Sequence, residues 1–510
     1  MSRGASQPAR RSGGQGADAA GLGQGGEPVD DLPLVVDLDR TLCRSDTLHD
    51  ALVMLLFTRP AMVRLLPTWL RAGKAAFKAE IAERLVPDPA LLPYDEAVLA
   101  LLRRARQAGR RTALVSASDH RVVEAVAAHL GLFDDVIGTG TGGDMQNLSH
   151  QATADRLVRL YGARGFDCIG DSAADLPVWM QARTALVVRP DHRLQAAASR
   201  DGIALQPVGE APTGRWSAMR PRLRALRPHQ WVKNLLVFLP VLAAHQPASL
   251  AVAFIAFIAF SLTASAVYII NDLTDLAADR AHKRKRYRPL ASGALPVGEA
   301  LVMASALFLG AIVIAALLAP PAFLLVLSVY VIATFAYSLW IKRKLLVDVV
   351  ALSGLYTLRI VAGAVAAGIV LSPWLLGFSM FLFFSLAAIK RQAELTDSGL
   401  DGQEAVPGRA YAGTDLPVIR SMAVTSGQAA VLVLALYVSS DDVVQLYASP
   451  SLLWLVCPIL FYWISRMVLV THRGHMTDDP IVFAARDWRS LLAAGLMAML
   501  VFGAIFWGKA

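Results

Sequence analysis

Residues 271–280 read Asn-Asp-Leu-Thr-Asp-Leu-Ala-Ala-Asp-Arg, directly after an apolar run at 249–270 and just before a strongly basic loop. On a continuous helix Asp272, Asp275 and Asp279 are spaced i, i+3 and i+7, so they share one narrow face. Carboxylates gathered at a membrane boundary repel one another and are costly unless a cation joins them. Oxygen ligands of this kind suit Mg²⁺. The segment therefore predicts a magnesium–phosphate site at the membrane edge; the alternative is a solvated acidic helix end.

The composition indicates a membrane protein. The chain has 510 residues, of which 55% are hydrophobic and 17% charged, with a mean hydropathy of +0.47. A soluble domain has about a quarter charged residues, so the composition argues against an all-soluble protein. The net charge of +9 fits basic loops beside apolar spans, and no regular basic–aromatic pattern indicates a nucleic-acid partner. Cys43, Cys168 and Cys457 lie far apart, which excludes a disulfide framework and a structural zinc site.

Nine apolar segments after about residue 225 have lengths suited to crossing a lipid bilayer. The first of them is short, and it is either a span or a re-entrant segment. The predicted spans are residues 231–246, 249–270, 299–319, 322–341, 346–370, 373–390, 420–439, 449–470 and 490–508. The sequence therefore predicts an all-α polytopic membrane bundle of about nine helices.

Basic residues cluster at 280–288, 342–344, 390–391 and 472–473, in every second connection between these spans. Because the alternate connections lack positive charge, the basic loops should be cytoplasmic. Residues 1–31 are rich in Gly, Ala, Ser and Gln and lack the apolar core of a secretory signal, so the domain that follows should also be cytoplasmic. We expect a multi-pass protein of a bacterial inner (plasma) membrane with a cytoplasmic N-terminal domain.

Changes in composition along the chain divide it into four parts. They are a disordered tail at 1–31, a soluble α/β domain at 32–204 with a helical insertion at about 48–90, an Arg- and Pro-bearing linker at 205–226, and the membrane domain at 227–510.

Three predicted strands of the α/β domain end in polar side chains. The strands are residues 32–36, 111–115 and 166–169, and they are followed by Asp37 and Asp39, by Ser116, and by Asp171 and Asp175. Carboxylates two residues apart on an extended chain project the same way. Ligands of parallel α/β sheets collect at the carboxyl edge of the strands. These side chains therefore form one predicted constellation.

With these motifs the α/β domain resembles the haloacid dehalogenase superfamily of phosphatases, which implies a Rossmann-like fold with a helical cap. The resemblance implies that Asp37 is the nucleophile that forms an aspartyl-phosphate, that Asp39 is the general acid/base and that Ser116 binds phosphate. It also implies Mg²⁺ on Asp37, Asp39 and Asp171, supported by Asp175.

One position departs from this superfamily's pattern. Its members place a lysine between the second and fourth motifs, but this chain has no lysine between Lys78 and Lys233. The corresponding segment, around Asn147, carries polar residues. Arg156 or Arg159 is a possible substitute, although a forked guanidinium does not replace an ammonium conservatively. The alternative is a degenerate phosphatase fold that serves as a regulatory or docking module.

The insertion at 51–86 is apolar and basic and includes Trp69. These features fit a helix that rests on the membrane surface. Packing over the phosphatase site explains them equally well.

The acidic motif and the spans together resemble the UbiA superfamily of intramembrane prenyltransferases. The typical aromatic prenyltransferases of this superfamily have a second aspartate-rich motif at the end of the sixth span. This chain has basic residues there, at 390–391. Residues 227–234, 286–293 and 390–394 look like decaprenyl-phosphate phosphoribosyltransferase. This resemblance implies transfer of 5-phosphoribose from phosphoribosyl diphosphate to a polyprenyl phosphate lipid. Basic residues in place of the second acidic motif suit a site that gathers several phosphates.

The second resemblance also implies roles for particular residues. Mg²⁺ on Asp272, Asp275 and Asp279, supported by Asn271, would bind the departing diphosphate. The cations that would hold the phosphates are Lys233, Arg280, Arg286, Arg288, Lys390 and Arg391. Some of them have an alternative role against anionic lipid headgroups.

The predicted function is a phosphoribosyl transfer to a lipid in the bilayer, followed by removal of the 5-phosphate by the fused domain. The alternative is a prenyltransferase that uses a polyprenyl diphosphate donor and an aromatic or lipid acceptor, with a non-catalytic front domain. Arg359 lies inside a predicted span, which indicates a site residue or the buried partner of an acid. The oligomeric state stays open.

Overall fold

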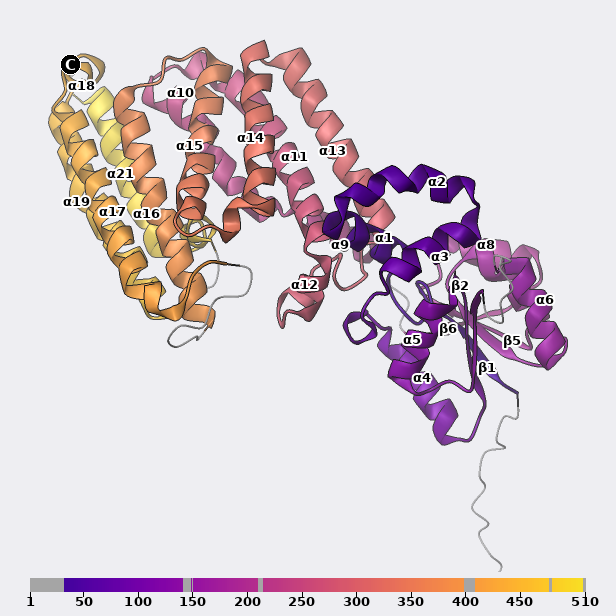
Figure 1. The fold of residues 1–510 in the computed structure, drawn as a ribbon. Helices are drawn as coiled ribbons and strands as arrows, with labels where there is room; N and C mark the ends of the chain where they lie inside the picture. Colours follow the sequence, from indigo (N-terminus) through magenta and orange to yellow (C-terminus); the bar gives the residue numbers. More distant parts are fainter. Residues whose placement is uncertain are drawn as a thin grey trace, which may run out of the picture.

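The computed structural model describes residues 32–140, 148, 150–209, 214–398, 409–476 and 479–507. The predicted tail at 1–31 and Asn147 lie outside the described residues. The chain forms an α/β domain followed by a helical bundle, and the two parts contact each other along one side of the bundle (Figure 1).

The α/β domain is built on a six-stranded parallel sheet in the order β3-β2-β1-β4-β5-β6. The apolar run of β1 is buried on both faces, as is usual for a central parallel strand. The strands are β1 (Leu34–Asp37), β2 (Thr112–Asp119), β3 (Asp135–Thr139), β4 (Asp167–Gly170), β5 (Thr184–Val188) and β6 (Leu205–Val208).

Helices cover both faces of this sheet. One face packs on α4 (Glu96–Gln107) and α5 (His120–Leu130). The other packs on α6 (His150–Tyr161), α7 (Leu176–Gln181) and α8 (His192–Arg200). Since β1 lies between β2 and β4, their carboxyl ends meet at the point where the strand order reverses, which is the usual ligand site of such sheets.

A helical cap follows β1, as the sequence predicts. It consists of α1 (Thr47–Thr58), the 3₁₀ segment η1 (Pro60–Leu65), α2 (Leu66–Arg71) and α3 (Lys74–Arg84). The chain bends by 120° between α1 and the η1–α2 segment.

The described residues of the predicted linker form regular secondary structure. Strand β6 lies within residues 205–226 and belongs to the sheet, so the α/β domain extends beyond its predicted end. The rest of this stretch includes a helix, α9 (Arg215–Leu226).

Within the described residues, eight helices are long and apolar enough to cross a membrane. They are α11 (Leu250–Thr274), α13 (Val297–Leu318), α14 (Pro321–Leu339), α15 (Val347–Ala367), α16 (Pro373–Ser398), α17 (Leu416–Val438), α19 (Val456–His472) and α21 (Trp488–Phe506). Shorter helices connect or flank them: α10 (Leu239–Ala243), α12 (Leu276–Ala281), α18 (Asp441–Leu446) and α20 (Pro480–Ala484). The multi-pass helical bundle is thus confirmed.

The short first segment, 231–246, does not form a spanning helix. It is divided between the 3₁₀ segment η5 (Pro228–Phe238) and α10, and η5 packs against α11 and α15. The short length of this segment left two alternatives, a span or a re-entrant segment, and the span is the one that does not form.

Candidate active sites

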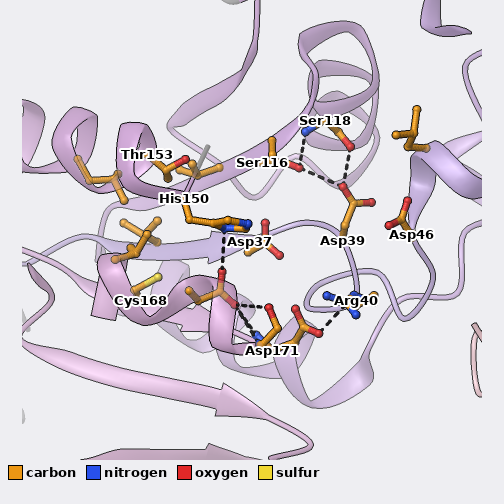
Figure 2. A pocket seen from close by; sticks show the side chains of 18 of the residues that line it. Asp37, Asp39, Arg40, Asp46, Ser116, Ser118, His150, Thr153, Cys168 and Asp171 are labelled. Carbon is orange, nitrogen blue, oxygen red and sulfur yellow. Dashed lines mark hydrogen bonds and ion pairs between the residues drawn. The ribbon is translucent and has the colours of Figure 1, made fainter. Parts of the chain in front are cut away.

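The first site lies at the carboxyl ends of β1, β2 and β4, around a cavity of about 240 Å³ (Figure 2). Asp37 ends β1 opposite Val115 of β2, so Ser116 follows at the same edge. Asp171 follows β4, the other neighbour of β1. The four predicted residues Asp37, Asp39, Ser116 and Asp171 all line this cavity.

Asp39 is held by the helix N-terminus that begins the cap. Its Oδ1 accepts hydrogen bonds from the backbone N–H of Thr47 (2.6 Å) and from the Thr47 hydroxyl (2.7 Å). Its Oδ2 accepts from Ser118 (2.6 Å) and from Ser116 (3.2 Å). Burial nevertheless raises the pKa of Asp39, which suits a carboxyl group that gives up and takes back a proton.

Several carboxylates converge here. Burial, and then the charges of Asp175, Asp39 and Asp171, raise the pKa of Asp37 well above its usual value. Burial also raises the pKa of Asp171 to about 6. Such a cluster is stabilised by a cation. Among the described residues, no group of three or more His, Cys, Asp or Glu side chains is arranged so that it could hold a metal ion by itself. A magnesium ion needs fewer protein ligands, since it commonly binds one or two carboxylates together with waters and substrate phosphate. These residues therefore fit it.

Asp175 organises the turn after β4. Its Oδ2 accepts hydrogen bonds from the backbone N–H groups of Asp171 (3.0 Å) and Ser172 (3.1 Å). Arg40 forms an ion pair with Asp171 at 3.4 Å. Asp175 therefore positions Asp171, which is consistent with the supporting role predicted for it.

The cavity contains a lysine that the sequence motifs do not reveal. Lys78 of α3 lines it, and its Nζ donates to the carbonyl oxygen of Ala117 at 2.6 Å. Neither Arg156 nor Arg159, the substitutes considered from the sequence, lines this cavity. Lys78 is the last lysine before the long lysine-free stretch, but its place in the cap rather than after β2 hides it from motif reasoning.

The second site lies around the acidic motif, whose geometry differs from the predicted single face. Helix α11 ends at Thr274, and Asp275 stands at the break before α12. Arg288 forms ion pairs with both Asp272 (3.1 Å) and Asp279 (2.6 Å). The side chain of Asp275 is 43% exposed and instead pairs with Lys342 at 3.3 Å. The structure therefore brings together the first and third aspartates, without the second.

Asp272 borders a cavity of about 920 Å³ that is rich in arginine. Arg227 forms a further ion pair with Asp272 at 2.5 Å. The basic side chains that line the cavity include Arg220, Arg224, Arg227, Arg284 and Arg288. Asp272 is the only acidic side chain among the described lining residues. Beside it, the Oδ1 atom of Asn271 is buried without a hydrogen-bond partner among the described residues.

Two of the predicted phosphate-binding arginines lie elsewhere. Arg280 is buried between the two domains, where it pairs with Asp50 of α1 at 2.7 Å and donates to the hydroxyl of Ser45 at 3.1 Å. Arg286 is exposed, donates to the hydroxyl of Tyr287 at 2.8 Å and does not line the arginine-rich cavity. The structure gives Arg280 a role at the domain interface.

Lys233 and Lys390 meet at a carboxylate that sequence reasoning missed. Asp479, at the N-terminus of α20, pairs with Lys233 at 2.7 Å and with Lys390 at 3.2 Å. It also accepts a hydrogen bond from the hydroxyl of Tyr356 at 2.8 Å. The only signal in the sequence is the acidic pair that ends at Asp479, in a loop next to a basic one.

The other two buried cations have their own partners. Arg391 forms an ion pair with Asp348 at 2.7 Å and another with Glu394. Arg359 donates to the side-chain oxygen of Asn234 at 2.9 Å and to the hydroxyl of Tyr330 at 3.2 Å. These contacts hold helices together, and the described contacts of Arg359 are with neutral groups rather than with an acid.

These two sites and the two-part fold define a polytopic membrane transferase with a phosphatase-like domain in front of it. The family of haloacid dehalogenase-like hydrolases matches residues 34–179, and the UbiA prenyltransferase family matches residues 235–488. The chain therefore belongs to the UbiA prenyltransferase family and carries a haloacid dehalogenase-like domain.

Relatives match either most of the chain or a part of it. The uncharacterized protein y4nM of Sinorhizobium fredii is 38% identical, over 92% of this chain and 90% of that protein. The nodulation protein NoeC of Azorhizobium caulinodans is 38% identical, over 56% of this chain and 95% of that protein. A decaprenyl-phosphate phosphoribosyltransferase of Mycolicibacterium smegmatis is 38% identical, over 37% of this chain and 61% of that protein.

Proposed function

We propose that the membrane domain transfers 5-phosphoribose from phosphoribosyl diphosphate to a polyprenyl phosphate, and that the front domain then removes the 5-phosphate. The observation that carries this proposal is the arginine-rich cavity beside Asp272. Five arginines and one carboxylate are among its described lining residues, so it suits a donor that carries several phosphates. The likeness to a phosphoribosyltransferase supports the same donor.

In the transfer, an oxygen of the lipid phosphate attacks the anomeric carbon of the donor, and the bond from that carbon to diphosphate breaks. Asp272 and Asp279 would hold Mg²⁺, which neutralises charge on the departing diphosphate. Arg227 and Arg288 already contact these carboxylates, so they stand where diphosphate oxygens would arrive. Arginine forks match phosphate oxygens, and they stabilise the charge that develops during departure.

Lys233 and Lys390 are proposed to bind the phosphate of the lipid acceptor. Two ammonium groups share one carboxylate at Asp479, which leaves a net positive charge on this cluster. Tyr356 adds a hydroxyl to the same group. A lipid monophosphate satisfies these donors.

In the front domain, Asp37 attacks the phosphorus of the 5-phosphate and forms an aspartyl-phosphate, while Asp39 gives its proton to the departing sugar oxygen. Asp39 then takes a proton from the water that hydrolyses the acyl phosphate, and inorganic phosphate leaves. Asp37 and Asp171 would hold Mg²⁺, which reduces repulsion between the nucleophile and the anionic ester.

We propose that the α/β domain and the basic loops lie on the cytoplasmic side of a bacterial inner membrane. The loops at 280–288 and 342–344 lie at the ends of α11 and α14, on the side where the α/β domain docks. Basic loops favour this orientation.

One experiment separates both activities. The full-length protein is given phosphoribosyl diphosphate or geranylgeranyl diphosphate with polyprenyl phosphate, and lipid products are identified by mass. We expect the dephosphorylated ribosyl lipid from the wild type, its 5-phosphate from Asp37→Asn, and neither from the Asp272→Asn/Asp279→Asn double variant. A product from the prenyl donor alone contradicts the proposed donor, and an unchanged product from Asp37→Asn contradicts the coupled phosphatase.

A further inference from the structure

The cap has an unusual composition for a surface segment. From residue 51 to residue 79 the chain has no Asp or Glu, whereas it has five Lys or Arg residues and many apolar ones. Several large apolar side chains on this stretch are exposed: Phe57 (42%), Val63 (51%), Leu65 (41%) and Leu70 (61%). Arg59, Arg64 and Arg71 are exposed among them. We call these seven residues the cap face.

The core of the cap does not account for this face. Trp69 is buried and packs with Leu55 and Ile81 in the cap's own apolar cluster, and Arg84 lies over its ring. Leu48 and Lys78 line the phosphatase cavity. The cap thus has a packed interior and a side that serves the cavity, and the cap face is a third, outward surface.

The cap is attached to the membrane bundle. Helix α1 contacts α11 and α13, and Val53 packs in one buried cluster with Ile269 and Leu273 near the end of α11. The ion pair between Asp50 and Arg280 lies at the same contact. In Figure 1 the indigo cap helices accordingly lie at the end of the bundle that carries α12. The lengths of α11 and α13 imply that the ends contacted by α1 lie at the edge of a bilayer, and η1 and α2 continue directly from α1.

We propose that the cap face lies in the headgroup layer of the anionic leaflet next to α12, so that the phosphatase site takes phosphate esters carried by membrane lipids. Apolar side chains with flanking arginines and no acidic residues are the pattern of a segment that binds anionic lipid from the side. The cap face is continuous with the attachment of α1 to the spans, which commits it to the bilayer. The assignment of the ester substrate rests on the phosphatase activity proposed above, whereas contact with lipid does not.

The test uses full-length protein in vesicles, with single cysteines at Val63 or Leu70 labelled by an environment-sensitive fluorophore. Cys43, Cys168 and Cys457 are buried, so their thiols should stay unlabelled in the native protein. Leu160→Cys is the matched control, since Leu160 is an exposed apolar residue of α6 in the same domain. The vesicles are phosphatidylcholine with or without phosphatidylglycerol, and they contain a lipid with a nitroxide at its headgroup.

We expect strong nitroxide quenching at Val63 and Leu70 in anionic vesicles and little at Leu160. Replacing Arg59, Arg64 and Arg71 with Gln should reduce the quenching at Leu70 several-fold. The same triple variant should slow phosphate release from the lipid-linked ester and leave hydrolysis of p-nitrophenyl phosphate unchanged. Quenching no greater at Val63 and Leu70 than at Leu160 overturns the proposal, even if the phosphatase activity is present. Quenching without any phosphatase activity retains the lipid contact and overturns only the assignment of the substrate.

Discussion

At the scale of single residues, Lys78 supplies an ammonium group to a phosphatase-like site whose expected lysine is missing from the sequence. Its Nζ bonds the carbonyl oxygen of Ala117, between Ser116 and Ser118, and both serines contact Asp39. Burial lowers the pKa of Lys78, while the charge of Asp39 opposes that shift. A lysine so placed is well suited to balance the charge of a bound phosphate, and it reaches the cavity from the cap rather than from the α/β core.

Lys78→Met should therefore lower kcat for phosphate release by about 10²–10³-fold, the usual cost of removing one fixed donor from a developing anion. Lys78→Arg should restore part of the rate, because the charge is kept but the shape is not. Lys74→Met, on the exposed start of the same helix, is the control and should leave the rate unchanged. Steady-state phosphate release by the full-length protein gives the rates of all three variants, and Asp37→Asn serves as the inactive reference. Equal rates for the Lys78 and Lys74 variants would remove Lys78 from the reaction.

At the scale of elements, the packing of η5 against α15 depends on one glycine. A Cβ added at Gly363 would lie 1.9 Å from the backbone oxygen of Val237, a contact that only a shift of the backbone relieves. At Gly354 of the same helix an added Cβ meets nothing within 4 Å. The glycine lets a non-helical segment lie against a spanning helix, and that segment carries Lys233.

Gly363→Ala should destabilise the membrane domain by about 1–3 kcal/mol, as overpacking usually does, and weaken the apparent affinity for the lipid acceptor. Gly354→Ala should leave both unchanged or slightly stabilise the helix. Thermal unfolding of the detergent-solubilised protein and the KM for polyprenyl phosphate measure these effects. Similar melting temperatures for the two variants would show that η5 can move away from α15 at little cost.

At the scale of the whole molecule, one buried ion pair joins the cap to the acidic motif. Arg280 follows Asp279 directly in α12, and its partner Asp50 lies one turn after Thr47, which holds Asp39. The two candidate sites are thus connected through α1 and α12. Both side chains of the pair are almost fully buried, so removing one partner leaves the other charge without compensation.

Arg280→Met should therefore cost about 3–5 kcal/mol of stability at the domain contact. Burial already raises the pKa of Asp50, and loss of Arg280 should raise it further. When a carboxyl group has a raised pKa in the folded protein, the stability of that protein falls as pH rises through this pKa. The variant should therefore melt much lower than wild type at pH 8 and recover near pH 5. Arg222→Met breaks an exposed pair with Glu299 and should change little at either pH. Melting curves and hydrogen exchange of α1 at both pH values decide this.

Local patterns in the chain were enough to predict much of this architecture. Apolar runs followed by Asp37, Ser116 and Asp171 predicted the strands and the first site, because side chains at the ends of parallel strands must meet at one edge. The lengths of the apolar segments predicted nine spans, because a bilayer fixes how long such a segment must be. Eight of them form spanning helices in the described residues, and the short segment at 231–246 does not.

Local patterns could not predict which charged side chains pair with each other. Each partner comes from a distant part of the chain, and its position depends on packing. Lys78 reaches the phosphatase cavity from the cap, and Asp479 lies between two lysines that are far from it in sequence. The break in the helix at Asp275 separates it from Asp272 and Asp279, and docking of the α/β domain buries Arg280. Burial makes an unpaired charge costly, so the assembled fold, rather than residue spacing, selects which cations stay available to a substrate.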